Sequence, residues 1–232
     1  MSIAQAMILA AGRGERMRPL TDTCPKPLLK VKGKPLIGYH LDTFAHCGFR
    51  DVVVNTAWLG EQIEDHYGHE TSEGARIVYS HEGRDFGGAL ETAGGIARAL
   101  PLLDDCFWLV AGDVHMPDFL FTRAAYDRFR ASGDLAHLVL VPNPPHNPQG
   151  DFGLDAGGRA LNKADVRHTY STVALLRQAL FDTIPRGNPQ GLKVPLAPLL
   201  RAAMDRGQVG AELYEGTWID VGTPERLAQL NA

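Results

Sequence analysis

The sequence predicts an α/β fold in which a mostly parallel β-sheet is flanked by helices. Short apolar runs with the length of buried strands recur along the chain, and amphipathic stretches with helical spacing separate them. This alternation is typical of parallel strands joined by right-handed crossover helices. The 232 residues suffice for one domain with a substantial core, and 44% hydrophobic and 22% charged residues are ordinary for a globular protein.

In the first half of the chain the expected strands and helices alternate regularly. Apolar runs predict strands over 6–9, 51–55, 76–80 and 106–111, and helical periodicity predicts helices over 35–47, 59–66 and 89–103. The pair Gly94-Gly95 is costly inside the last of these helices unless another segment packs closely against it. Ligands of parallel sheets bind at the carboxyl ends of strands, where Gly12 and Asp113 both fall.

The second half is less regular. Strands are expected over 135–141, 169–176 and 216–221, and a helix is expected within 192–204 after a proline-interrupted approach. The sequence contains no internal repeat and no low-complexity linker. We therefore expect a single domain over 1–232.

Charge and cysteine content exclude several classes of protein. The net charge of -4 gives no general attraction to nucleic acid or to an anionic membrane. The three cysteines form no CxxC pair, which argues against a disulfide framework or a zinc site and fits a reducing cytoplasm. The N-terminal apolar run is too short for a signal peptide, and no apolar stretch has the length of a membrane span. We expect a soluble cytoplasmic protein.

The strongest functional signal lies in the stretch 9–28. It follows the first apolar run and contains the Ala-Gly-Arg-Gly turn of residues 11–14, where glycines allow a sharp turn and close approach of a ligand. Seven cations lie within 13–34, opposed by only two acids. A strand, a glycine turn and a run of cations together indicate a binding site for a polyphosphate.

Two common phosphate-binding motifs do not account for this stretch. A dinucleotide fingerprint requires a third glycine where Met17 stands, and a P-loop requires a Gly-Lys-Ser/Thr sequence that is missing. A solvated basic loop after a strand is the plain alternative. Prolines on both sides of Lys26 stiffen the loop, which favours a binding role.

The pattern A-G-x-G-x-R-M-x-P-L-T followed by P-K-P-L resembles the signature of the sugar-1-phosphate nucleotidyltransferases. The stretches 57–66, 143–154 and 193–204 are most similar to the members that join UTP to N-acetylmuramate 1-phosphate in bacterial cell-wall (peptidoglycan) recycling. The resemblance implies a Rossmann-like sheet of the nucleotide-diphospho-sugar transferase type. It also implies a nucleotide-binding half over about 1–115 and a sugar-binding half over about 116–232.

The implied reaction is attack of a sugar 1-phosphate on the α-phosphorus of a nucleoside triphosphate, with loss of pyrophosphate. Such a reaction needs neutralised charge and aligned substrates but no side-chain nucleophile. The resemblance assigns Arg16 and Lys26 to the reacting phosphates, and Asp113 and Asp220 jointly to Mg²⁺. Forked arginine donors do suit phosphate, and Mg²⁺ does prefer carboxylate oxygens. Taken singly, an aspartate after a strand is as often a turn former.

The resemblance also predicts the residues that bind the nucleotide. Glu82 would accept a hydrogen bond from N3–H of a uracil or thymine ring. The alternative is that Glu82 is a solvated loop carboxylate. The loop 83–89 is longer than in similar members, which bears on the base contacts. Close backbone approach would occur at Gly94. The other predicted contacts come from the signature loop: Ala10, Ala11, Gly12, Arg13 and Gly14.

Three residues are predicted to lie near the sugar: Ala111, Asp151 and Thr172. Ala111 stands where similar members carry asparagine before Gly-Asp, and Thr172 replaces a glycine. Both departures bear on which sugar is used.

Other functions fit parts of the pattern. Mannose or heptose 1-phosphate guanylyltransferases and glucose 1-phosphate thymidylyltransferases catalyse the same chemistry on other substrates. A catalytically silent nucleotide-sugar sensor would be expected to lose at least one of the four key residues, and a choline-phosphate cytidylyltransferase would need a cation cage that the sequence does not clearly supply. We expect UTP and a sugar 1-phosphate as partners, no nucleic acid or membrane, and a monomer or small homo-oligomer.

Overall fold

The computed structural model describes residues 3–232 and confirms the α/β prediction. The central sheet consists of β1 (Ala4–Ala10), β4 (Asp51–Thr56), β5 (Arg76–His81), β6 (Leu103–Ala111), β8 (Ala136–Val141), β11 (Thr169–Arg177) and β12 (Val209–Leu213). The helices are α1 (Leu36–His46), α2 (Gly60–Tyr67), α3 (Glu82–Phe86), α4 (Glu91–Ala99), α5 (Arg123–Ser132), α6 (Leu196–Asp205) and α7 (Pro224–Asn231). Three pairs of two-residue strands lie outside the sheet: β2 (Lys30–Val31) with β3 (Lys34–Pro35), β7 (Val114–His115) with β13 (Ile219–Asp220), and β9 (Gly153–Leu154) with β10 (Ala160–Leu161).

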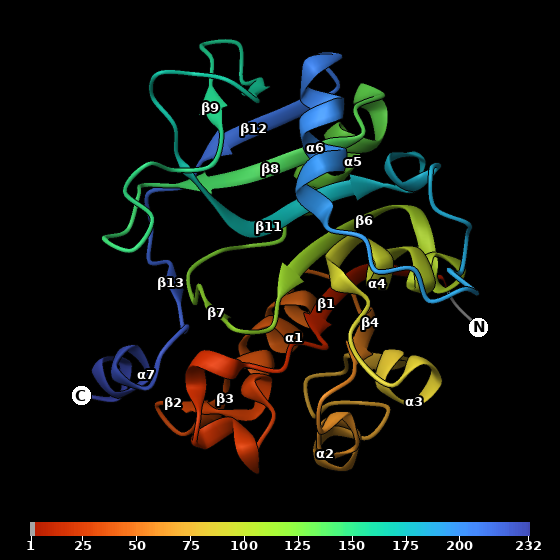
Figure 1. Cartoon of the computed structure of the whole chain (residues 1–232), viewed down its shortest axis with the longest axis vertical. Coiled ribbons are helices and arrows are strands. Elements are labelled where there is room, and N and C mark those ends of the chain that lie inside the picture. Colours follow the sequence, from red (N-terminus) through yellow and green to blue (C-terminus); the bar gives the residue numbers. More distant parts are fainter. Residues whose placement is uncertain (1–2) are drawn as a thin grey trace.

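The strand order of the central sheet is β12-β8-β11-β6-β1-β4-β5 (Figure 1). Neighbouring strands are parallel except for β11, which is antiparallel to both β6 and β8. From β1 the chain adds β4 and β5 on one side and later β6 on the other, so the strand order reverses between β1 and β6. Ligands of open α/β sheets bind at such a point, beyond the carboxyl ends of the strands.

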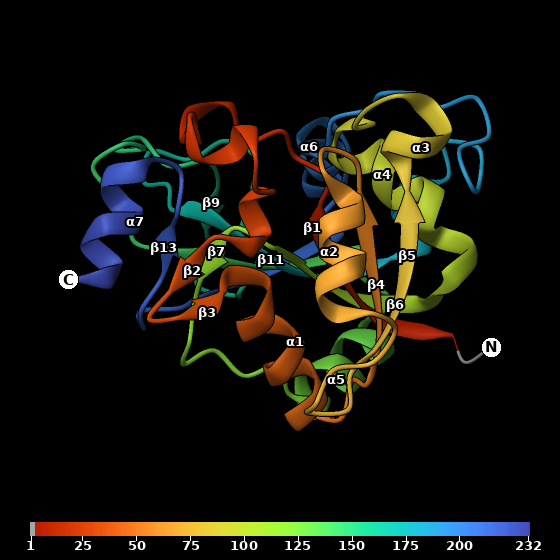
Figure 2. The same ribbon diagram turned by 90° about the horizontal axis from the view of Figure 1, so that it is seen from below.

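Two apolar cores lie on opposite faces of the sheet, because neighbouring residues of a strand point to opposite sides. Met7 belongs to the core formed with α4 and α6, whereas Ile8 belongs to the core formed with α1 and α5. In Figure 2 the first pair of helices lies on one side of the strands and the second pair on the other. A smaller third core consists of Met17, Leu29, Val31, Leu36 and Val221, and Leu227 and Leu230 of α7 pack against it.

Three predicted elements differ from the structure. The helix predicted over 89–103 ends at Ala99, and a 3-10 turn containing Pro101 follows, because proline cannot continue the helical hydrogen-bond ladder. The strand predicted over 216–221 is only Ile219–Asp220 and pairs with β7 rather than entering the central sheet. The segment 83–89, expected as a loop, begins with the short helix α3.

Sequence reasoning also missed α5, α7 and β12. Both helices carry ordinary signals: Thr122 and Thr223 cap their first turns through side-chain hydrogen bonds, and Gly133 ends α5 in a left-handed conformation. Strand β12 was hidden because it is a short edge strand whose last two residues are exposed. No helix within residues 3–232 is both long and apolar enough to span a membrane.

Candidate active site

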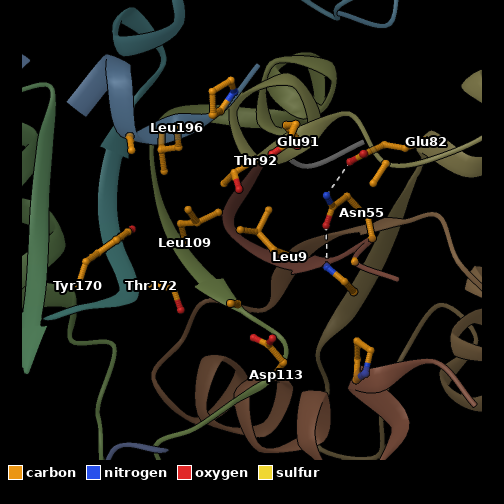
Figure 3. Close-up of a pocket in the computed structure, with 18 of the residues that line it drawn as sticks. Leu9, Asn55, Glu82, Glu91, Thr92, Leu109, Asp113, Tyr170, Thr172 and Leu196 are labelled. Carbon is orange, nitrogen blue, oxygen red and sulfur yellow. Dashed lines mark hydrogen bonds between the residues drawn. The ribbon is translucent and has the colours of Figure 1, made fainter. Parts of the chain in front are cut away.

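A cavity of about 620 Å³ opens beyond the carboxyl ends of β1, β4 and β6, where the strand order reverses. We call it the main cavity; the residues that line it include Leu9, Asn55, Glu82, Glu91, Thr92, Leu109, Asp113, Tyr170, Thr172 and Leu196 (Figure 3). A small cavity of about 240 Å³ is lined by Gly14, Arg16 and Gly222, among others. The two cavities share Gly12, Lys26 and Asp113, so they adjoin at these residues.

The signature loop leaves β1 at the boundary between the two cavities. Ala10 and Ala11 are buried and line the main cavity, and Gly12 lines both cavities. The backbone N–H of Ala10 donates to Oδ1 of Asn55 on β4 at 2.8 Å, which fixes the end of β1. Gly14 has φ +67, and a Cβ there would lie 3.0 Å from Cγ2 of Thr21, so the turn requires glycine.

The three arginines of the signature loop have different surroundings. Arg16 is exposed, lines the small cavity and forms no ion pair with any residue of the described chain. Arg13 is turned away: its guanidinium lies 3.6 Å from the centre of the Trp58 ring and donates to the carbonyl of Thr21 at 2.8 Å. Arg18 pairs with acids of its own loop. Only Arg16 therefore meets the requirement for a phosphate-binding arginine, and Arg13 holds the loop in shape.

Lys26 and Asp113 form a close ion pair where the cavities adjoin. Nζ of Lys26 lies 2.5 Å from Oδ2 of Asp113, and the lysine is only 8% exposed although it carries a charge. A buried ammonium needs a partner of opposite charge, and Asp113 supplies it from the turn after β6. The structure thus brings together two residues that the sequence placed in separate motifs.

Asp220 reaches the same region from the C-terminal part of the chain. It pairs with Val114 in the short β7–β13 ladder, and the N–H of Val221 donates to the carbonyl of Asp113 at 3.1 Å. Oδ2 of Asp220 accepts a hydrogen bond from Arg226 at 3.0 Å and lies 3.6 Å from Nε2 of His146. Asp113 and Asp220 therefore sit on adjoining chain segments: Asp113 lines both cavities, whereas Asp220 lines neither and lies two residues before Gly222 of the small cavity.

The donor set around these aspartates fits Mg²⁺. Each carboxylate has one oxygen, Oδ1, that accepts no hydrogen bond from any residue from 3 to 232. No cluster of three or more potential metal-ligating side chains occurs among those residues. Mg²⁺ keeps several waters and is commonly bound through one or two carboxylates together with substrate phosphates, so two free carboxylate oxygens match its needs.

Glu82 lies at the far end of the main cavity from Asp113 and is buried rather than solvated (Figure 3). Its Oε1 accepts from Nδ2 of Asn55 at 2.6 Å, and its Oε2 accepts from the N–H of Leu90 at 2.7 Å. Burial raises the pKa of Glu82, while these two hydrogen bonds lower it. Asn55 thus connects Glu82 to the end of β1 through a continuous chain of hydrogen bonds.

Gly94 and Gly95 lie where other segments pack closely against α4. This agrees with the expectation that a glycine pair inside a helix is tolerated only where such packing occurs. A Cβ at Gly95 would lie 2.3 Å from Oε1 of Glu82. A Cβ at Gly94 would lie 2.3 Å from the carbonyl oxygen of Leu192, in a loop that is hydrogen-bonded to the start of α4. Gly94 is not among the residues that line either cavity, so the close approach it permits is that of the chain's own backbone.

Two of the three residues predicted for the sugar line the main cavity. Ala111 and Thr172 do so, whereas Asp151 does not. Oδ2 of Asp151 accepts from the N–H of Tyr170 at 2.8 Å and from Asn147, so Asp151 holds the first residues of β11 in place. Thr172 has φ +64, a conformation in which glycine is far less strained than threonine.

Several cavity residues were not found by sequence reasoning. Asn55 looked like the end of a buried strand, and Tyr170 like part of another. Glu91 lines the cavity with φ +62 at the start of α4, and Leu196 lines it at the start of α6. Only one signal was available in advance: Asn55 is a polar residue at the carboxyl end of a predicted parallel strand.

Comparison with known proteins adds sequence relatives. Residues 5–162 match the family described as Nucleotidyl transferase. An N-acetylmuramate alpha-1-phosphate uridylyltransferase from Neisseria meningitidis is 49% identical, and the match covers 98% of this chain and 97% of that protein. A protein of the same name from Caulobacter vibrioides is 32% identical over 95% of this chain and 92% of that protein.

More distant likenesses extend to other sugars. A UTP--glucose-1-phosphate uridylyltransferase from Synechocystis sp. is 32% identical, with 94% of this chain and 60% of that protein covered. A crystal structure from Bacillus anthracis, described as a glucose-1-phosphate thymidylyltransferase, has a TM-score of 0.78 at 19% identity and covers 98% of this chain and 94% of that one. At this identity the likeness bears on the fold alone.

Proposed function

Because the chain belongs to the nucleotidyl transferase family, as its signature motif predicted, we propose that it transfers the uridylyl group of UTP to N-acetylmuramate 1-phosphate. A phosphate oxygen of the sugar forms a bond to the α-phosphorus of UTP, and the bond from that phosphorus to the bridging oxygen of the β-phosphate breaks. The products are UDP-N-acetylmuramate and pyrophosphate. Such a reaction returns a cell-wall sugar to its nucleotide form, which places the enzyme in peptidoglycan recycling.

The observation that carries this proposal is the convergence of Arg16, Lys26, Asp113 and Asp220 around two adjoining cavities. Both substrates are anionic, and aligning them requires cations on the phosphates. We assign Arg16 to the triphosphate, since it is exposed on the small cavity without an acidic partner. We assign Lys26 to the reacting phosphates, since it lies where the cavities adjoin.

Asp113 and Asp220 would hold the divalent cation, and we propose Mg²⁺. When bound, the cation supplies positive charge to phosphate oxygens as charge develops on the departing pyrophosphate. The other roles belong to residues of the protein. Lys26 neutralises Asp113 and the phosphates, and the buried backbone at Ala10 and Ala11 keeps the loop in place.

We propose that the uracil ring binds at the end of the main cavity formed by Ala10, Asn55, Glu82 and Ala89. Oε1 and Oε2 of Glu82 each already accept one hydrogen bond, and a carboxylate oxygen can accept two. Glu82 can therefore still accept the N3–H of uracil, while Asn55 and Leu90 hold it in a fixed orientation.

We propose that the opposite end of the main cavity binds the sugar. Its walls are largely apolar and include Leu109, Phe152, Leu196 and Leu200, with Tyr170 and Thr172 as polar neighbours. N-acetylmuramic acid carries an N-acetyl group and a lactyl ether, and the methyl groups of both suit an apolar wall better than the bare hydroxyls of glucose do. The Neisseria relative that is 49% identical is also named an N-acetylmuramate alpha-1-phosphate uridylyltransferase.

The test is pyrophosphate release with Mg²⁺ across UTP, dTTP, GTP and CTP, each with N-acetylmuramate, N-acetylglucosamine, glucose, mannose and heptose 1-phosphates. Turnover confined to UTP with N-acetylmuramate 1-phosphate is expected. Turnover with another pair would keep the chemistry and replace the substrates. Nucleotide binding without turnover on any pair would favour a sensor, the one candidate from a different functional class.

We also propose a domain assignment, a cellular location and an oligomeric state. Residues 1–232 act as one catalytic domain, with the nucleotide bound mainly by residues before about 115 and the sugar mainly by later ones. The enzyme works in the cytoplasm, where UTP is available. We propose that it acts as a monomer or small homo-oligomer.

A further inference from the structure

Arg226 lies directly behind one of the two aspartates assigned to the metal. Its Nη1 donates to Oδ2 of Asp220 at 3.0 Å and to the backbone carbonyl of the same residue at 3.1 Å. The two side chains are 22% and 21% exposed, so the pair is mostly shielded from water. One guanidinium therefore fixes both the carboxylate and the backbone of Asp220.

The two aspartates share one arrangement. Lys26 holds Oδ2 of Asp113 and Arg226 holds Oδ2 of Asp220, while Oδ1 of each accepts no hydrogen bond from residues 3–232. Nε2 of His146 lies 3.6 Å from the oxygen that Arg226 already holds. In both residues one oxygen is held by a cation and the other is left for a ligand.

Helix α7 carries Arg226 and is held by hydrogen bonds at both of its ends. The residue lies in the first turn of α7, after Thr223, whose side chain caps the helix. At the other end of α7, Asn231 accepts from the N–H of Lys32 at 2.8 Å and donates to the carbonyl of Lys30 at 3.0 Å. These bonds tie the helix to the β2–β3 hairpin that follows the signature loop.

The third core connects this helix to the phosphate-binding side of the site. It buries Met17, the neighbour of Arg16, together with Val221, the neighbour of Asp220, and Leu227 of α7 packs against it. A displacement of α7 would therefore move Asp220 relative to Arg16. A Cβ at Gly222 would lie 3.0 Å from both Nη1 of Arg226 and Oδ2 of Asp220, so a side chain there would push the two groups by a few tenths of an ångström.

We propose that Arg226 is a positioning residue that holds Oδ2 of Asp220 and so presents Oδ1 to the divalent cation. This inference rests on the proposed function only in assigning the cation to Asp220. Groups that orient metal ligands commonly change metal affinity 10- to 100-fold when they are removed. A lysine is a poor replacement for Arg226, because its nitrogen lies one bond closer to the backbone than Nη1 and its ammonium rotates freely, whereas the guanidinium holds its N–H donors in a fixed plane.

The test measures binding of Mn²⁺ alone, without nucleotide, by electron paramagnetic resonance of the free ion. R226K is compared with R159K, a matched control: Arg159 also engages a part-buried aspartate, Asp134, and a backbone carbonyl, that of Gly207, outside both cavities. We expect R226K to weaken Mn²⁺ binding about tenfold and to lower kcat with little change in the KM of the sugar. R159K should leave all three quantities unchanged.

Two further variants distinguish a role of Arg226 from poor folding of R226K and from loss of the ligand Asp220. G222A retains Arg226 but crowds its contact with Asp220, and it should weaken Mn²⁺ binding even if R226K folds poorly. D220N is the reference for complete loss of the ligand. Wild-type Mn²⁺ affinity in R226K and G222A, with weak binding in D220N, would refute the role of Arg226 alone. Unchanged affinity in D220N would remove Asp220 from the metal site and Arg226 with it.

Turnover on the substrate panel is a separate readout, since Mn²⁺ binding needs no substrate. A chain that binds Mn²⁺ as expected but turns over no pair would overturn the proposed reaction and leave the role of Arg226 intact.

Discussion

Thr172 is held in a backbone conformation that threonine rarely adopts. Its φ is +64, and it sits where the register of β11 against β8 shifts between Tyr170 and Val173, so Ser171 and Thr172 form a bulge beside the main cavity. Left-handed backbone costs an L-residue about 1–2 kcal/mol, and a β-branched residue feels this cost strongly. Oγ1 of Thr172 offsets part of it by donating to the carbonyl of Ser171 at 2.5 Å.

A comparison of T172A with T172G isolates this strain. Both variants lose the hydroxyl and the methyl group, but only glycine relieves the positive φ. Glycine also loses about 0.5–1 kcal/mol through the greater freedom of the unfolded chain. The net expectation is that T172G is more stable than T172A by up to about 1 kcal/mol, or about 2–4 °C in Tm for a chain of this length.

The assay is thermal unfolding followed by circular dichroism, with the pair T43A and T43G as the control. Thr43 lies inside α1, where alanine should be more stable than glycine by about 1 kcal/mol. The order of stability should therefore reverse between the two positions. Equal stability at position 172, or a more stable T172A, would refute the claim that this bulge stores strain.

Variants at Asp113, Arg16, Arg13 and His40 test the site and its surroundings. D113N should lower turnover by about two to three orders of magnitude and also lower Tm, because the buried Lys26 loses its charged partner, as measured by pyrophosphate release and circular dichroism; near wild-type turnover in the folded variant would remove Asp113 from the metal site. R16A should lose activity similarly, whereas R13A should keep kcat and lower Tm, because Arg13 packs on Trp58 outside both cavities; the opposite pattern would exchange their roles. Burial lowers the pKa of His40 to about 4, so the unfolded chain binds more protons and stability falls as pH drops from about 6.5 to 4, by up to about 3 kcal/mol. H40Q should flatten this fall in Tm, and an unchanged slope would assign the acid sensitivity to other groups.

The order of strands and helices was largely predictable because local periodicity encodes it. The runs at 51–55 and 76–80 gave β4 and β5 to within a residue, since each is a short apolar stretch bounded by polar turns. The direction of β11 was not predictable. An antiparallel strand and a parallel one have the same side-chain alternation, and only the path of the chain between them decides.

The phosphate end of the site was easier to predict than the sugar end. Arg16 and Lys26 are close in sequence, and their loop can be recognised from its glycines, prolines and cations. At the sugar end, the cavity depends on how the bulge of β11 and the start of α6 meet, which no local pattern encodes. Glu82 was found, but its burial was not foreseen, because it results from hydrogen bonds to Asn55 and Leu90 on other elements.

Strand β13 and helix α7 show that the catalytic centre depends on contacts between residues that are far apart in the sequence. Asp113 follows β6 in the middle of the chain, and Asp220 joins it only when β13 pairs with β7. That two-residue ladder buries little surface by itself, so it needs the third core, in which Val221 packs with Met17. No residue of α7 or β13 belongs to either of the two main cores. Trp218, the residue before β13, packs against the core that is formed with α1 and α5. The nucleotide end of the main cavity is therefore built without α7, whereas Asp113 and Asp220 come together only where β13 pairs with β7 and α7 packs against the third core.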